Sequence, residues 1–198
     1  MPKFMNIFRM SAVFTVVCLG MLASIRGIAQ DIKPAREVYQ AQAMGTLTQT
    51  GRTFNVTVNI EQYSPPEERQ TLVDAFGEKG SDGLYNALEK MHAKGRIAMT
   101  GTLGYDISFA RKVPIEGGFK IRVLTNRPIE IGEAYVNGRT MDYNLSALEL
   151  DIYNDKSKNT GMLLPAVLFK IDKKTGEVIA ENYQNPWKLV NIMDRSNE

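Results

Sequence analysis

Acidic residues are the side chains of this sequence whose types and spacing come closest to the reacting groups of an enzyme. The candidates are Asp106, Glu130, Glu133, Glu149 and Asp151. Two carboxylates can divide acid and base work when their surroundings push their pKa values apart, and glycoside hydrolysis needs them roughly 5 to 9 Å apart. Glu149 and Asp151 share one face of a predicted strand, but it is the polar face, where acidic residues are ordinary. We therefore assign no catalytic residue.

A glycine-bounded segment, residues 45–53, looks superficially like a phosphate-binding loop. Its spacing is one residue too long, Arg52 stands where lysine is expected, and strands are predicted on both sides. We interpret it as a hairpin turn. His92 is the only histidine, and we expect it on the surface of the second helix of residues 65–94, close to its C-terminal end. There is no Gly-x-Ser-x-Gly motif, so nothing in the sequence indicates a serine nucleophile.

A short polar segment alternates oxygen-bearing side chains as a calcium loop does. These are Asp155, Ser157 and Asn159, but the glycine that follows comes one place late and Ala166 stands where the bidentate glutamate belongs. Two lysines add positive charge to the same segment. The sequence therefore predicts a solvated loop, and we expect neither a metal site nor a cofactor.

The first 29 residues have the pattern of an export signal. Lys3 and Arg9 give a positive start, residues 10–23 form an apolar run, and Gly27 and Ala29 are small residues at positions −3 and −1 of a cleavage site. The run is shorter than the roughly 20 residues that span a bilayer, so we expect cleavage, with a retained anchor as the alternative. No twin-arginine pair is present, which favours the general secretory route and a periplasmic or extracellular location.

Cleavage of the signal would change the charge balance and the cysteine content of the chain. The chain has 24 basic and 22 acidic residues, and three of the basic ones lie in the first 29. The remainder has 21 basic and 22 acidic residues, mixed along the sequence, and we predict no nucleic-acid binding. The only cysteine, Cys18, also lies in the signal, so the mature chain has no thiol, disulfide or cysteine metal site.

Alternating hydrophobicity dominates the mature chain. Residues 54–61 place Phe, Val, Val and Ile on one face and Asn, Thr, Asn and Glu on the other, which predicts a half-buried strand that pairs with residues 38–48. Apolar positions in residues 65–94, interrupted by Gly77 and Gly80, predict a helical hairpin. Period-two segments then continue to the end of the chain, and Asn137-Gly138 predicts a tight turn among them.

These patterns define the expected architecture. Residues 30–36 form a flexible leader, and residues 37–198 form one domain. We predict a mainly β (α+β) fold, an antiparallel barrel or sandwich of about ten strands, with the helical hairpin inserted after the second strand. Hydrophobic periodicity does not choose between barrel and sandwich.

Two segments, residues 95–106 (GRIAMTGTLGYD) and 184–192 (QNPWKLVNI), resemble parts of small exported bacterial β-rich proteins without an assigned activity. The likeness extends over the layout of the mature chain and includes no catalytic motif. It implies an exported β-rich module and no particular chemistry.

Our main functional expectation is an exported, non-enzymatic binding module, or an envelope-associated one, that takes a small apolar molecule into a barrel cavity. Five aromatic residues are the expected wall of that cavity, with plain core packing as the other interpretation: Phe54, Tyr105, Phe109, Phe119 and Trp187. Alternatives are a structural or protein-interaction protein of the cell envelope and a carboxylate-dependent hydrolase of cell-wall sugars. No transmembrane span is expected after cleavage, and the sequence does not specify the oligomeric state.

Overall fold

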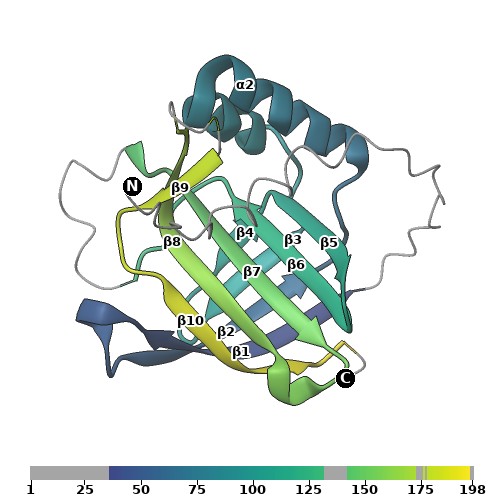
Figure 1. Ribbon diagram of the computed structural model, residues 1–198, viewed down its shortest axis with the longest axis vertical. Coiled ribbons are helices and arrows are strands. Elements are labelled where there is room, and N and C mark those ends of the chain that lie inside the picture. Colours follow the sequence, from purple (N-terminus) through teal and green to yellow (C-terminus); the bar gives the residue numbers. More distant parts are fainter. Residues whose placement is uncertain (1–35, 132–141, 173–175, 177, 197–198) are drawn as a thin grey trace, which may run out of the picture.

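The computed structural model describes residues 36–131, 142–172, 176 and 178–196 (Figure 1). This part of the chain forms ten antiparallel strands in one sheet and one α-helix. The predicted signal and nearly all of the leader, together with Glu133 and the Asn137-Gly138 turn, lie outside the described residues. No helix of the described part is long and apolar enough to cross a membrane.

The helices and strands of the described residues have the following bounds. The helix α2 spans Pro66–Glu89, and two 3₁₀ turns are η2 (Leu47–Gln49) and η5 (Lys156–Lys158). The strands are β1 (Glu37–Gly45), β2 (Thr53–Ile60), β3 (Gly95–Met99), β4 (Tyr105–Ile107), β5 (Phe109–Ile115), β6 (Gly118–Thr125), β7 (Leu145–Tyr153), β8 (Thr160–Ile171), β9 (Val178–Asn182) and β10 (Trp187–Asp194).

The sheet curls into a nearly closed barrel, with strand order β4-β3-β2-β1-β10-β8-β7-β6-β5 and β9 paired to β8 outside this path. Its two ends meet because β4 and β5 are consecutive pieces of one bent segment. Ile107 pairs with Gly95 of β3, and the next residue, Ser108, donates its backbone N–H to the carbonyl of Leu124 at 2.9 Å. The predicted mainly β fold is confirmed. Of the two predicted alternatives, a barrel and a sandwich, the sheet resembles the barrel. Closure leaves few unpaired strand edges.

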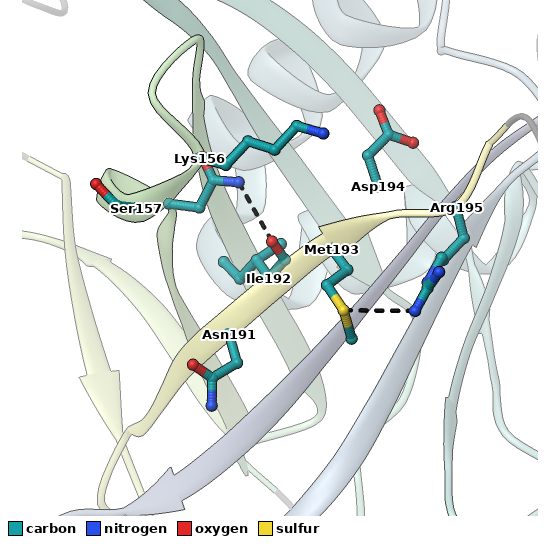
Figure 2. A pocket seen from close by; sticks show the side chains of 8 residues that line it. Lys156, Ser157, Asn191, Ile192, Met193, Asp194 and Arg195 are labelled. Carbon is teal, nitrogen blue, oxygen red and sulfur yellow. Dashed lines mark hydrogen bonds between the residues drawn. The ribbon is translucent and has the colours of Figure 1, made fainter.

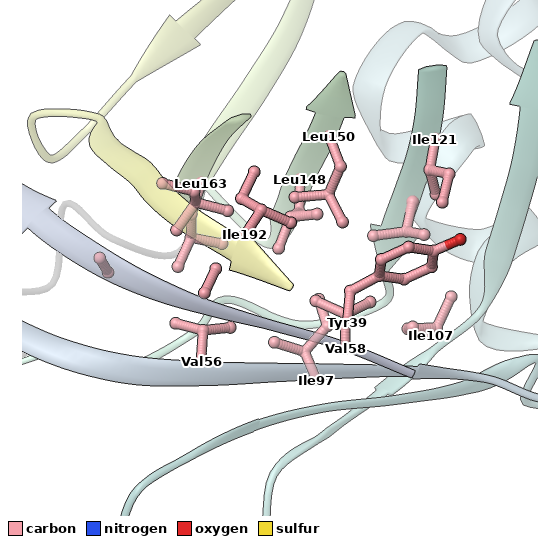
Figure 3. Packing of buried hydrophobic residues seen from close by; sticks show 14 of the residues in the cluster. Tyr39, Val56, Val58, Ile97, Ile107, Ile121, Leu148, Leu150, Leu163 and Ile192 are labelled. Carbon is pink, nitrogen blue, oxygen red and sulfur yellow. The ribbon is translucent and has the colours of Figure 1, made fainter. Parts of the chain in front are cut away.

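Alternation along each strand fills the barrel. In β2, Val56, Val58 and Ile60 are fully buried while Asn55 is exposed, as the sequence predicted. The paired strand β1 contributes Tyr39, Ala41 and Ala43 to the same interior. Figure 3 shows side chains of β1–β3 meeting those of β7, β8 and β10 across the interior. Twenty buried residues of the described part form this inner core.

The helix α2 covers part of the outer face of the sheet at one end of the barrel (Figure 1). Leu72, Leu84 and Leu88 pack there against residues that point away from the barrel interior. Four of those residues form one cross-strand row, Phe109–Leu124–Ala147–Leu164. The fold therefore has a second hydrophobic core between helix and sheet.

The predicted helical hairpin is corrected to a single helical element with a break inside it. Gly80 has φ 59° and ψ −141°, a conformation that glycine alone adopts readily. Beyond the break the chain packs closely on its first half, because a Cβ placed on Gly83 would overlap the carbonyl oxygen of Ala75. Of the two glycines that suggested two helices, Gly80 thus produces the break, and no loop separates the two parts.

Candidate functional site

A β-bulge in β10 interrupts the pairing of this strand with β1. The pairing of β1 with β10 shifts between Gln40, opposite Met193, and Gln42, opposite Val190. Asn191 lies in the bulge with φ 53°, one of two non-glycine residues of the described part with positive φ. Bulges re-aim side chains, and unusual backbone conformations concentrate at functional sites. Two hollows adjoin this residue.

The first hollow, which we call groove A, lies between η5 and the end of β10 and has a volume of about 680 Å³ (Figure 2). The amide of Asn159 supports its floor by donating to the carbonyl of Ile192 at 3.3 Å and accepting from the backbone of Tyr153 at 2.8 Å. Its charged groups are Lys156, Asp194 and Arg195. Groove A is therefore polar, with charges of both signs at its rim.

The second hollow, groove B, lies on the outer face of β1 and β2 and has a volume of about 480 Å³. It shares Asn191 and Met193 with groove A. The amide Nδ2 of Asn191 donates to Oε1 of Gln42 at 3.3 Å across the strands. The remaining polar side chains of groove B carry no charge: Gln40, Asn55, Thr57 and Thr100.

Amides and hydroxyls define what groove B can do chemically, and they occur in groove A beside its charged groups. Each amide offers both donors and acceptors, and each hydroxyl offers a donor and acceptor lone pairs. Such groups match hydroxyls or peptide groups of a ligand without needing a charge on it. Among the described residues, no group of three or more His, Cys, Asp or Glu side chains could hold a metal ion.

A second polar cluster surrounds Glu37, beside the buried ring of Tyr39. Oε2 of Glu37 accepts hydrogen bonds from the hydroxyls of Tyr39 at 2.6 Å and Tyr63 at 2.7 Å. The ammonium of Lys112 donates to both carboxylate oxygens and lies 3.8 Å from the ring centroid of Phe119. Burial, followed by the bonds to Glu37, raises the pKa of both tyrosines far above its usual value. These phenols therefore stay protonated and act as donors.

No separate signal for this cluster is present in the sequence. Glu37 and Tyr39 are two positions apart at the start of a strand, as the hydrogen bond between them requires. Lys112, however, comes from the other side of the barrel, 75 positions along the chain. Only the closed topology brings it to Glu37.

The five aromatic residues predicted to line a cavity do not share one site. Trp187 and Phe54 pack edge to face with ring centroids 4.7 Å apart, and Trp187 is buried in the inner core. Tyr105 and Phe119 are half-buried beside that core, whereas Phe109 belongs to the second core under α2. All five therefore make core contacts, and their role in ligand binding stays a prediction.

Glu149 and Asp151, the two acids that share a strand face, have a common cationic partner. The ammonium of Lys120 lies 2.5 Å from a carboxylate oxygen of Glu149 and 3.3 Å from one of Asp151. Burial acts to raise the pKa of Glu149, but its bonds to Lys120 and Arg122 outweigh that effect and lower it. A general acid needs the opposite shift. Asp106 is exposed and pairs with Arg96 at 3.0 Å.

The other sequence candidates have local structural roles. Residues 45–53 form the turn of the β1–β2 hairpin, as predicted, and contain η2. Asp155 accepts hydrogen bonds from the backbone and hydroxyl of Ser157 at the start of η5. His92 is exposed but lies beyond the end of α2 rather than on it, which corrects the helix boundary.

Comparison with known proteins reveals no relative for this chain: no family model, curated protein or solved structure matches it.

Proposed function

We propose that this protein is an exported, non-enzymatic binding module of the cell envelope that holds a neutral, hydroxyl-rich ligand in grooves A and B. Sugar chains have the hydroxyl-rich chemistry that such grooves would recognise. One observation carries the proposal: the bulge in β10 places Asn191, with positive φ, where the two hollows adjoin. The export signal predicted from the sequence supplies the location.

The composition of groove B supports a neutral ligand. Gln40, Gln42 and Asn55 are uncharged and project from adjacent strands, so their spacing is fixed by the sheet. Hydrogen-bonding groups on strands are held more rigidly than groups on loops. A ligand that replaces the bond between Asn191 and Gln42 would leave neither amide unsatisfied.

Binding of a small apolar ligand in the barrel interior, as expected from the sequence, has less support than binding in grooves A and B. Twenty buried side chains of the described part occupy the barrel interior. An apolar molecule between Phe54 and Trp187 would have to separate rings that now touch. Grooves A and B require no such rearrangement.

Titration with soluble oligosaccharides of cell-wall type, followed by isothermal calorimetry and amide NMR shifts, tests the proposal. Asn191→Gly keeps the positive φ but removes the amide, and we expect it to weaken binding about tenfold, the equivalent of one hydrogen bond. Gln42→Ala should have a similar effect. Gln70→Ala on α2 is the matched control and should bind normally. Shifts confined to residues outside both grooves, or no binding at millimolar concentration, would refute the proposal.

The alternative of an envelope interaction protein is favoured by β9. All five of its residues are exposed, and in the described part it pairs only with β8. Ile171, Val178 and Ile179 expose between 43% and 51% of their surface at this hairpin. Unprotected edge strands pair readily, and here the candidate partner is β9 of a second copy. Sedimentation of the mature chain tests this: a dimer dissociated by Ile179→Lys supports the alternative, and a monomer excludes it.

A further inference from the structure

The outer face of the sheet carries a row of charged residues directly beside α2. The row Phe109–Leu124–Ala147–Leu164 is covered by the helix. Two residues further along the same strands, the next row on that face is Arg111–Arg122–Glu149. This second row therefore borders the helix, where solvent and ligands reach it.

Two arginines face each other in this row. Arg111 of β5 is directly opposite Arg122 of β6 in the antiparallel register. Directly opposed side chains in such a pair have Cβ atoms about 4.5 to 5.5 Å apart, and like charges there are destabilising. Burial lowers the pKa of Arg111, and the charges of Arg69 on α2 and of Arg122 lower it further. Three guanidinium groups thus lie near one another.

The nearby carboxylates neutralise only part of the positive charge on these strands. Oε2 of Glu149 accepts from Nε of Arg122 at 2.6 Å, while its other oxygen accepts from Lys120. Asp151 lies 3.3 Å from the same lysine. In the described part of the chain, no carboxylate lies within ion-pair distance of Arg111. On these strands the two acids thus face three cations, and the patch keeps a positive excess centred on Arg111.

We propose that Arg111 and Arg122, with Arg69 beside them, form a binding site for a phosphate-type oxyanion, separate from grooves A and B. A bound anion would replace the repulsion between the opposed arginines with charge-assisted hydrogen bonds. The planar guanidinium fork matches phosphate oxygens in pairs, which lysine cannot do. Two opposed forks offer more donors than one carboxylate can accept, which favours phosphate. The phosphate group belongs either to a soluble molecule or to a lipid headgroup, and both present the same oxygens.

Phosphate titration of the mature protein, followed by the NMR signals of the arginine side chains, tests the site. We expect saturable shifts at Arg111 and Arg122 with inorganic phosphate, and weaker binding with acetate. Arg111→Gln should weaken phosphate binding about tenfold, and Arg111→Lys should restore only part of it. Arg52→Gln removes the same charge from the β1–β2 turn and serves as control. Equal affinity in all variants, or no saturable shift, would overturn the proposal.

A stability measurement separates a binding role from a structural one. If the arginine pair serves a ligand, Arg111→Gln should raise the thermal midpoint without phosphate and abolish the stabilisation that phosphate gives. A lowered midpoint without phosphate would mean that Arg111 supports the fold itself, and would overturn the proposal. Sedimentation with phosphatidylglycerol vesicles identifies the source: arginine-dependent binding indicates a lipid headgroup, and phosphate binding without vesicle binding indicates a soluble ligand.

Discussion

The ammonium group of Lys94 lies 2.7 Å from a carboxylate oxygen of Glu68 and joins the start of β3 to the first turn of α2. Only 5% of the Lys94 side chain is exposed. A charge this buried is costly unless it is paired. The ion pair therefore holds the helix in place while shielding the lysine.

Removing one partner of this pair should cost more than removing both. We expect Glu68→Leu to lower the free energy of unfolding by about 3 kcal/mol, because Lys94 is left buried and unpaired. The double variant Glu68→Leu/Lys94→Met should recover most of that loss. Urea denaturation of the three proteins measures the coupling. Additive losses in the double variant would show that the two side chains act independently.

Gly80 and Gly77 offer a matched test of the break in α2. Neither has a heavy atom within 4 Å of the position that a Cβ would take, so steric contacts do not distinguish them, but only Gly80 has positive φ. We expect Gly80→Ala to destabilise the protein by about 1 to 3 kcal/mol through backbone strain. Gly77→Ala should stabilise it by up to about 1 kcal/mol. Thermal unfolding of both variants measures this, and equal effects would contradict the assigned role of Gly80.

Stability at acid pH should depend on Glu149. Despite its burial, its bonds to Lys120 and Arg122 lower its pKa below the usual 4.5. The carboxylate therefore contributes stability that is present above about pH 4.5 and lost as the pH falls through the lower folded value. Glu149→Gln should cost about 1 kcal/mol at pH 7 and flatten the acid limb of the stability profile. An unchanged acid limb would count against this ion-pair network.

Stability at alkaline pH should depend on the two tyrosines bonded to Glu37. Burial raises the pKa of Tyr39 and Tyr63 above the usual 10.0, so the folded state retains protons that the unfolded state loses. Their contribution is complete below about pH 10 and decreases as the pH rises further. Tyr63→Phe should reduce this alkaline slope, measured by urea denaturation between about pH 9 and 11. Tyr153→Phe, outside the cluster, is the control and should keep the slope.

The sequence predicts the parts of this fold that depend on neighbouring residues better than the parts that depend on residues distant along the chain. Alternation within residues 54–61 predicts β2 and its buried face because the signal is local. Closure depends instead on the bend at Ser108 and on the pairing of β1 with β10, which join distant segments. Periodicity carries no information about such pairings. The sequence therefore predicts about ten strands without choosing between barrel and sandwich.

The candidate sites were harder to predict because they depend on the exact register of paired strands. Asn191 occupies what looks like an ordinary polar position of a strand, and only the register shift against Gln42 reveals the bulge. Arg111 and Arg122 are close along the chain, on the two strands of one hairpin, and their opposition follows from the length of the β5–β6 turn. A hairpin turn at Gly117 was predictable, so this pair could have been found by extending the register outward from it.

Trp187 provides a test of the inner core and a spectroscopic signal for it. It is the only tryptophan of the chain, is 2% exposed and packs against Phe54. Trp187→Ala should cost about 3 to 5 kcal/mol through the cavity it leaves. Trp187→Phe should cost about 1 to 2 kcal/mol, because its indole N–H has no hydrogen-bond partner in the described part and the loss is one of volume. Urea denaturation measured by circular dichroism compares both. A loss in Trp187→Phe as large as in Trp187→Ala would show that the indole makes a specific interaction beyond core packing.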